Sequence, residues 1–263
     1  MTRICFVTCF IGNAETAAIS KDFHKRDDCD YILFTNLTQE RLPKMPWEII
    51  TVDLEDLKHV NHAVKASRYF KFMLHEYLRK IERDYEFIFY CDAYLTPKKD
   101  ENWNALCDQL ADHDTGIMQY NHTGFGENMN ILREMELIAK CKKDSWENIK
   151  ATRKYLCEID PSVNMKTPQY YENTVFCIHL KNETAIRQCN EFWKYYLDCP
   201  TYRDQPLWNF LYLKNKITPL LVNEVRSIFA EEKNAFNVKS RHNRKWYRAD
   251  LRALIEEQQR KKQ

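Results

Sequence analysis

Short apolar segments recur along the first half of the chain, each bounded by polar or charged residues. They are rich in β-branched and aromatic residues and cover residues 3–10, 31–35, 47–52, 86–91 and 116–120. Two similar segments follow at residues 174–180 and 217–222. Runs of this length and composition are typical of strands buried on both faces, as in parallel sheets. We therefore expect a central sheet made mostly of parallel strands.

Helix-like segments lie between and after these strands. The clearest covers residues 62–79, where Val64, Tyr69 and Phe72 belong to an apolar stripe. Further helices are expected at residues 127–140, 145–156, 183–197 and 204–213, and from about residue 250 to the end. Strands that alternate with helices predict an α/β fold of the doubly wound, Rossmann-like kind, with helices flanking the sheet.

The chain shows no internal repeat and no Pro/Gly/Ser-rich linker. We therefore expect one domain over residues 1–250, followed by a charged C-terminal helix or tail at residues 251–263. In open sheets of this kind, ligands bind at the carboxyl ends of the strands, where the strand order reverses. Residues 8–12, 35–36 and 92–94 directly follow strands and are the first places to look for chemistry.

Composition and charge narrow the function. The chain has 263 residues, 44% of them hydrophobic, and a net charge of +2 from 40 basic and 38 acidic side chains. This balance gives no electrostatic reason to expect nucleic acid as the partner. Positive charge gathers late, at residues 239–248 and 260–262. We expect a solvated surface there, with peripheral contact to an anionic membrane or polyanion as the alternative.

Cysteine usage and hydropathy point to a compartment. The ten cysteines include no C-x-x-C pair, and several lie inside apolar runs, where a free thiol behaves as a small hydrophobe. No signal-peptide pattern is present, and no apolar stretch approaches the roughly 20 residues that span a bilayer. We expect a reduced, cytoplasmic protein.

The strongest local feature is an apolar strand that ends on a carboxylate. Residues 87–91 read Phe-Ile-Phe-Tyr-Cys, and Asp92 follows at once. A hard divalent cation bound together with a pyrophosphate needs such an oxygen ligand at the carboxyl end of a strand. An equally good interpretation is that Asp92 caps the next turn.

The helix before this strand carries cations. Lys65 and Arg68 are three positions apart and share a face of the predicted helix, with Lys71 one turn further on. Their side chains would reach a diphosphate held at Asp92. An ordinary solvated helix face is the blander alternative, and the commoner one.

A third feature begins a later helix. Asp204 fits an N-cap and Pro206 an early-turn proline, so Arg203-Asp204-Gln205-Pro206 favours a helix start on structural grounds alone. A helix N-terminus also attracts anions. His242, in a basic segment, fits surface decoration, or a nitrogen ligand if an acidic metal site needs one.

Taken in order, these features resemble nucleotide-sugar-dependent glycosyltransferases of the GT-A fold. More closely, the chain resembles the glycosyltransferase group known as domain of unknown function 616, over roughly residues 60–245. The shared pattern has a Lys- and His-bearing helix, an aromatic strand ending in Asp, an Arg/Glu helix, a strand after an acidic residue, an aromatic helix, Arg-Asp-Gln and a late His. These elements fall here at residues 65–75, 85–92, 133–136, 172–179, 192–193, 203–205 and 242.

The segment Asp-Gln-x-x-x-Asn also resembles retaining transferases typified by glycogenin. That resemblance implies that Asp92 is the first Asp of a DxD motif, Gln205 lies against the donor's anomeric carbon, and His242 completes a Mn²⁺ or Mg²⁺ site with Asp92. It also implies transfer with retention. The chain departs from DxD at Tyr94, so a cation would take more of its ligands from phosphate and water.

The resemblance further implies a UDP-sugar donor and a glycan or other hydroxyl acceptor. The donor's base would lie against Thr8, Phe10, Thr35 and Asn36, which follow or end the first two strands. Lys65, Arg68 and Arg203 would neutralise the diphosphate, Asp204 would orient donor hydroxyls, and the loop at residues 124–127 would face the acceptor.

Two other classes of protein use a similar fold. One is a nucleotide-sugar-binding module without catalysis, an interpretation that Tyr94 supports. The other is a nucleotidyltransferase, which would normally carry a Gly-rich phosphate loop after the first strand. Gly12 alone is a poor substitute for such a loop.

Overall fold

The computed structural model describes residues 3–13, 19–20, 23–60, 62–121, 128–222, 236–238 and 250–262. Its centre is a seven-stranded sheet of order β3-β2-β1-β4-β7-β6-β8. The strands are β1 (Ile4–Phe10), β2 (Cys29–Thr35), β3 (Glu48–Thr51), β4 (Phe87–Cys91), β6 (Ile117–Asn121), β7 (Tyr171–His179) and β8 (Leu220–Leu221). All seven overlap segments that the apolar pattern predicted as strands, although β2 and β7 begin two or three residues earlier than predicted.

The strand directions confirm a mostly parallel sheet. β1 pairs in parallel with β2 and β4, β2 with β3, and β6 with β8. Only β7 runs against its neighbours β4 and β6 among these strands. The expected α/β architecture, with a mostly parallel central sheet flanked by helices, is therefore confirmed. A second, two-stranded sheet joins β5 (Leu95–Pro97) to β9 (Phe236–Val238) and was not predicted.

Eight α-helices accompany the sheet in the described part of the chain. They are α1 (Ala63–Phe72), α2 (Leu74–Lys80), α3 (Trp103–Ala111), α4 (Ile131–Lys140), α5 (Trp146–Ile159), α6 (Glu183–Asp198), α7 (Asp204–Asn215) and α8 (Leu251–Lys262). Two short 3₁₀ helices, η2 (Gln39–Arg41) and η3 (Leu54–Leu57), lie near β3. α3, η2 and η3 were not predicted, because their apolar positions are too few to show a period.

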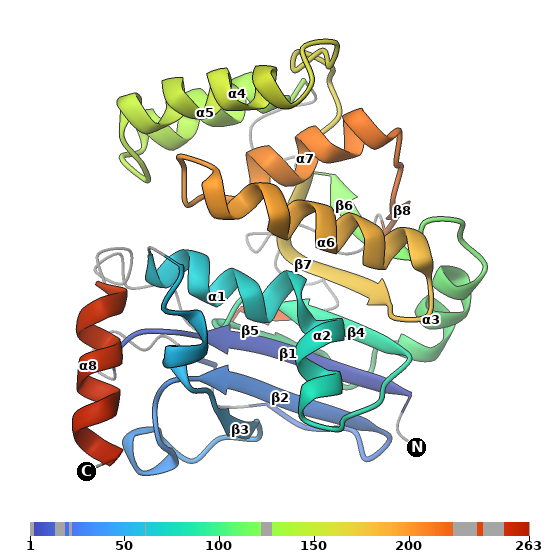
Figure 1. Cartoon of the computed structure of the whole chain (residues 1–263). Coiled ribbons are helices and arrows are strands. Elements are labelled where there is room, and N and C mark those ends of the chain that lie inside the picture. The colour runs from blue at the N-terminus through green and yellow to red at the C-terminus, as the bar shows by residue number, and fades with distance from the viewer. Residues whose placement is uncertain are drawn as a thin grey trace.

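The helix expected at residues 62–79 is in fact two helices. It breaks at Met73, whose backbone angles of −103° and 27° lie outside the helical region. The His62 side chain caps the start of α1 by accepting a hydrogen bond from the backbone N–H of Val64 at 3.1 Å. The break lets α1 pack against α6 while α2 turns aside, which a continuous apolar stripe does not reveal (Figure 1).

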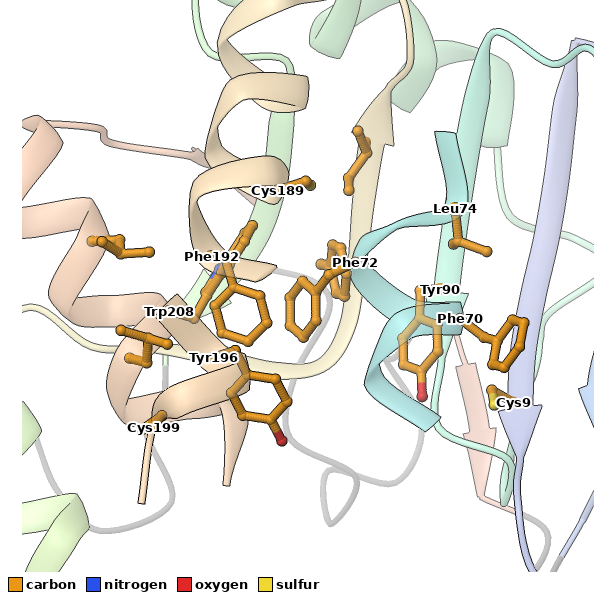
Figure 2. Close-up of a cluster of buried hydrophobic side chains, with 14 of the residues drawn as sticks. Cys9, Phe70, Phe72, Leu74, Tyr90, Cys189, Phe192, Tyr196, Cys199 and Trp208 are labelled. Carbon is orange, nitrogen blue, oxygen red and sulfur yellow. The ribbon is translucent and has the colours of Figure 1, made fainter. Parts of the chain in front are cut away.

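The two faces of the sheet have separate cores. One core lies under α1, α2, α6 and α7, and Figure 2 shows Phe72 of α1 facing Phe192 and Tyr196 of α6 and Trp208 of α7. The other lies under α3 and is built around Trp103. Side chains alternate along β4, so Phe87, Phe89 and Cys91 enter the α3 core while Ile88 and Tyr90 enter the α1 core.

The C-terminal helix α8 lies beside the carboxyl end of β3. The Gln258 amide donates to the carbonyl oxygen of Val52 at 2.7 Å, and its oxygen accepts from the Leu54 N–H at 2.9 Å. Leu251 and Leu254 of α8 are buried in the α1 core. A charged helix was expected here, and its apolar residues dock it onto the domain. Across the described residues, we find no helix that combines the length and apolar character needed to span a membrane.

Candidate active site

The sheet reverses its strand order between β1 and β4. From β1 the chain continues outward to β2 and β3, whereas β4 pairs with the opposite edge of β1. Asp92 directly follows β4 at this point, and its backbone N–H donates to the Thr174 carbonyl of β7 at 2.9 Å. The Tyr90 hydroxyl donates to Asp92 Oδ1 at 3.1 Å, which places the carboxylate on the α1 face. The structure thus puts Asp92 where such folds bind ligands.

Asp92 is one of four charged side chains that lie close together at this edge. We call them the charged cluster: Arg68 and Lys71 of α1, Asp92, and Asp204 of α7. Arg68 Nε lies 3.1 Å from Asp204 Oδ1, and Lys71 Nζ lies 3.1 Å from Asp204 Oδ2. Lys71 Nζ also lies 3.9 Å from Asp92 Oδ1. Two cations thus balance two carboxylates.

Exposure separates Asp92 from the other three members of the cluster. The side chains of Arg68, Lys71 and Asp204 are 8%, 2% and 4% exposed, whereas that of Asp92 is 18% exposed. The solvated helix face considered for Arg68 and Lys71 is therefore wrong. Arg68 points at Asp204 rather than at the open edge, so any effect on a diphosphate passes through the rest of the cluster. Asp92 is the member that presents itself to solvent.

Burial and charge act against each other in the cluster. Burial alone would raise the pKa of Asp204, but the charges of Arg68, Lys71 and Arg203 outweigh it and hold that pKa below its ordinary value. Burial lowers the pKa of Lys71, and the two carboxylates recover part of the loss. The Lys71 ammonium also lies 4.7 Å from the centre of the Tyr90 ring, a favourable cation–π distance. The cluster therefore keeps the Asp204 carboxylate ionised.

Asp204 does not cap α7, contrary to the prediction. Arg203 occupies the cap position without a side-chain cap hydrogen bond, and Asp204 is the first helical residue. Its carboxylate turns toward α1 instead, because Arg68 and Lys71 offer charge where a cap offers only backbone N–H groups. Arg203 is half-buried beside Asp204 and lowers its pKa. Asp204 therefore acts as a buried counter-charge, not as a group that faces an open edge.

Gln205 and Asn209 hold the start of β7. Asn209 Oδ1 accepts from the Tyr171 N–H at 2.7 Å, and its amide donates to the Tyr171 carbonyl at 3.0 Å. Gln205 Nε2 also donates to that carbonyl, at 3.3 Å. The Asp-Gln-x-x-x-Asn segment thus serves the fold at two of its three polar positions. The predicted place of Gln205 beside an anomeric carbon stays a prediction.

Lys65 lies on α1 but outside the charged cluster. Its ammonium donates to the carbonyl oxygens of Leu197 at 3.1 Å and Cys199 at 2.7 Å, at the end of α6. These carbonyls lack helical partners, so a buried cation stabilises them. The structure therefore gives Lys65, which is 3% exposed, a helix-capping contact in place of the predicted diphosphate contact.

The residues expected to contact the donor's base lie on the other face of the sheet. Thr8 and Phe10 alternate with Cys9, which faces the charged cluster, and Thr35 pairs with Phe10. Thr8 and Thr35 are 0% exposed and Phe10 is 3% exposed. The structure therefore does not bring these three side chains to an open surface.

Asn36 has a structural partner at the same edge. Its side-chain oxygen accepts from the Gly12 N–H at 2.8 Å, and its amide donates to the Gly12 carbonyl at 2.9 Å. This pair of bonds ties the end of β2 to the end of β1. With these two bonds, Asn36 fixes the turn at Gly12. A contact of Asn36 with the donor's base stays a prediction.

Lys71, a member of the cluster, was visible in the sequence as the next cation along the helix, one turn beyond Arg68. Two neighbours of the cluster were not among the predicted site residues. Glu172 and Asn173 come from β7, whose antiparallel direction brings the strand's start to the carboxyl edge of β4. Burial and the charge of Asp92 raise the pKa of Glu172, and Asn173 Nδ2 donates to Asp204 Oδ2 at 3.3 Å. No local pattern gives a strand's direction, so these two residues could not be placed beforehand.

The predicted metal site falls partly outside the described residues. His242 and the loop at residues 124–127 are both outside them. Within the described ranges, no group of three or more His, Cys, Asp or Glu side chains is arranged to hold a metal ion. Tyr94, at the second position of a DxD motif, is 5% exposed and packs in the α3 core. Of the predicted ligands, the structure therefore presents Asp92 alone.

Comparisons with known proteins give a distant likeness among solved structures. No family model matches the chain, and no curated protein matches it. Among solved structures, it is similar to a galactosyltransferase, LgtC, in complex with donor and acceptor sugar analogues. The match has 15% identity and a TM-score of 0.44, and covers 79% of this chain and 70% of that one. At this level of likeness, function has to come from the residues of the site. The resemblance to the domain of unknown function 616 group and to glycogenin stays a prediction.

Proposed function

We propose that the chain is a glycosyltransferase that moves a sugar from a nucleotide-diphosphate sugar, with UDP as the nucleotide, to a hydroxyl acceptor. The observation that supports it is the charged cluster at the point where the strand order reverses. A carboxylate, Asp92, lies there 3.9 Å from the buried ammonium of Lys71, and two helices, α1 and α7, converge on the cluster. Donor diphosphates bind at this place in open α/β sheets.

The chemistry needs a fixed charge at this edge. When a glycosyl group leaves, the nucleoside diphosphate gains negative charge and the sugar becomes positively charged. Asp92 would hold a Mn²⁺ or Mg²⁺ ion with phosphate and water as further ligands and His242 as its nitrogen partner, and the ion would neutralise the leaving diphosphate. Lys71 and Tyr90 orient the Asp92 carboxylate, which lowers the cost of reorganising it during the reaction.

The other residues have supporting roles in this proposal. Arg203, half-buried at the start of α7, and the helix N-terminus add positive potential next to the diphosphate. Gln205, 8% exposed in the first turn of α7, is the proposed neighbour of the anomeric carbon, and retention of configuration rests on it alone. Asp204 keeps Arg68 and Lys71 in place.

The test is release of free sugar and UDP from a panel of UDP-sugars, with Mn²⁺ or Mg²⁺ present. We expect slow hydrolysis by the wild type and a loss of about 100-fold or more in Asp92→Asn, the scale on which single electrostatic groups act in catalysis. The matched control is Asp108→Asn. Asp108 lies on α3, 68% exposed and paired with Arg3, and this variant should keep wild-type activity.

Each alternative function gives a different result. A binding module without catalysis would bind UDP and release no sugar from any donor. A nucleotidyltransferase would release pyrophosphate from a nucleoside triphosphate. Either result, or equal activity in Asp92→Asn and the wild type, would contradict the proposal.

A further inference from the structure

A buried network of side-chain amides connects the sheet to the charged cluster. Asn173 Nδ2 donates to Asp204 Oδ2 at 3.3 Å, and Asn173 Oδ1 accepts from Gln119 Nε2 at 2.9 Å. Gln119 lies on β6 and Asn173 on β7, and both are 2% exposed. Neither side chain was among the predicted site residues.

The orientation of the Gln119 amide is determined by its neighbours. Its oxygen accepts from Trp208 Nε1 at 3.1 Å and from the Tyr212 hydroxyl. Its nitrogen donates to the backbone carbonyl of Glu172 at 3.0 Å. An indole N–H only donates and a carbonyl only accepts, so a flipped amide would lose both bonds.

The fixed amide of Gln119 in turn fixes Asn173. Because Gln119 presents its NH₂ group, Asn173 must present its oxygen to Gln119 and its own NH₂ group to Asp204. A flipped Asn173 would point its amide oxygen at the Asp204 carboxylate. Two acceptors would then face each other with no hydrogen between them. In a buried network such a mismatch is costly, because no water replaces the lost bond.

The network also returns to the helix that carries Asp204. Asp204, Trp208 and Tyr212 lie at i, i+4 and i+8 of α7, on the side that faces the sheet. The chain of bonds therefore closes into a ring from α7 through β6 and β7 and back to α7. A shift of α7 along its axis would break the bonds at Gln119 and Asp204 together.

Resting on the proposed function, we propose that Gln119 and Asn173 are positioning residues that set the place and orientation of the Asp204 carboxylate. Through Asp204 they position Lys71, which reaches Asp92. They act in series on the Asp204 carboxylate itself, because only Asn173 contacts it. The bonds of Gln119 to Trp208 and Tyr212 hold α7 as a whole. Neither residue touches the donor.

The test is a double-mutant cycle on donor hydrolysis with Gln119→Met, Asn173→Leu and the double variant. We expect each single variant to lose about tenfold in kcat with little change in KM, the scale of one buried hydrogen bond. The double variant should lose the same tenfold. Independent roles would give about a hundredfold, because independent effects multiply.

The matched control is Gln188→Met. Gln188 is a fully buried glutamine of α6 that accepts from the Asn215 amide at 3.0 Å, away from the network. It should lose stability without losing kcat. A kcat loss in Gln188→Met equal to that in Gln119→Met would overturn the proposal, as would multiplication of the two network effects. If the apolar variants fail to fold, the same cycle is run with Gln119→Asn and Asn173→Ser, which stay polar and uncharged but shorten each side chain, so the bond between the two amides is lost.

The inference and the proposed function fail separately. A wild type that hydrolyses no donor overturns the proposed function. The network is then judged from urea unfolding, by the coupling between Gln119→Met and Asp204→Asn, two residues joined through Asn173. We expect a coupling that falls when Asn173→Leu is added, because the route through Asn173 is lost while the bonds of Gln119 to α7 remain. No coupling in either background would overturn the network.

Discussion

The two faces of the sheet are buried at the same carboxyl edge but filled in opposite ways. Under α1 and α7, Tyr90 lies against the charged cluster, in which Asp92 and Asp204 pair with Arg68 and Lys71. Under α3, Phe89 and Phe6 both pack on Trp103, with ring centres 4.9 Å and 4.7 Å from that of Trp103. One strand, β4, supplies both faces. The difference shows which face is built for stability and which carries charge at a cost.

The cost follows from desolvation. Aromatic side chains stabilise a fold by the area they bury and by their ring contacts. Buried ion pairs gain little, because removing each charge from water offsets most of the attraction between them. A cluster of four such charges is therefore poorly explained by stability alone. Its position at the strand-order reversal agrees with a functional role.

The largest effect on stability is expected on the α3 face. Trp103 is 0% exposed, and its indole donates to the Lys98 carbonyl at 2.9 Å. Trp103→Ala should lower the free energy of unfolding by about 3–5 kcal/mol, through lost burial and a cavity. Turnover per folded molecule should stay unchanged. Urea unfolding measures the loss of stability, and donor hydrolysis at low temperature, where the variant is folded, measures turnover. A large loss of kcat would show that the two faces of the sheet do not act separately.

Removing one charge from the cluster comes next. Asp204→Asn leaves Arg68 and Lys71 without their shared counter-charge and should cost about 3 kcal/mol. The pKa of Asp204 in the folded protein is lowered from 3.8, so its stabilisation is complete above that value and is lost as the pH falls. The gap between variant and wild type should therefore shrink in acid. A gap that stays constant with pH would contradict the ionised state of Asp204.

Glu172 should behave in the opposite sense. Burial and Asp92 raise its pKa in the folded protein above 4.5, so its ionisation reduces stability as the pH rises through that range. Glu172→Gln should therefore raise the free energy of unfolding near neutral pH and change it little in acid. The amide oxygen can still accept the Thr174 hydroxyl, which Glu172 holds at 2.8 Å. The measurement is urea unfolding of Glu172→Gln and the wild type at several pH values. A lower free energy of unfolding in the variant at neutral pH would contradict the prediction.

The smallest effect is expected at Thr8. Its hydroxyl oxygen is buried and has no hydrogen-bond partner among the described residues. Thr8→Val removes that polar atom without changing shape, and should stabilise the protein by up to about 1 kcal/mol. UDP affinity should not change, because Thr8 has no exposed surface. Calorimetric titration would reveal a weaker complex if Thr8 did contact the donor.

Much of the architecture could be predicted from the sequence, because apolar runs identify buried strands regardless of their neighbours. The approximate bounds of the strands and longer helices followed from this pattern. The break at Met73 did not, because α1 and α2 share one apolar stripe and separate only through packing. α3 was hidden for the opposite reason: Trp103, Cys107 and Leu110 are too few to show a period.

The site could be predicted only in part. Asp92 was recognisable because a carboxylate directly follows an apolar strand. The partners of Lys65 and Arg68 were not, since a buried lysine and an exposed one look alike in a helix. Asn173 depended on the direction of β7, and Gln119 on contacts between β6 and α7. Such long-range geometry leaves no mark on local spacing.

Equilibrium binding of UDP in the presence of Mn²⁺ tests the central claim most directly. The account predicts that Asp92→Asn weakens the complex by at least about tenfold, or 1.4 kcal/mol, while Thr8→Val and Asp108→Asn bind as the wild type does. Wild-type affinity in Asp92→Asn together with weakened binding in Thr8→Val would contradict it. That result would place the nucleotide on the opposite face of the sheet.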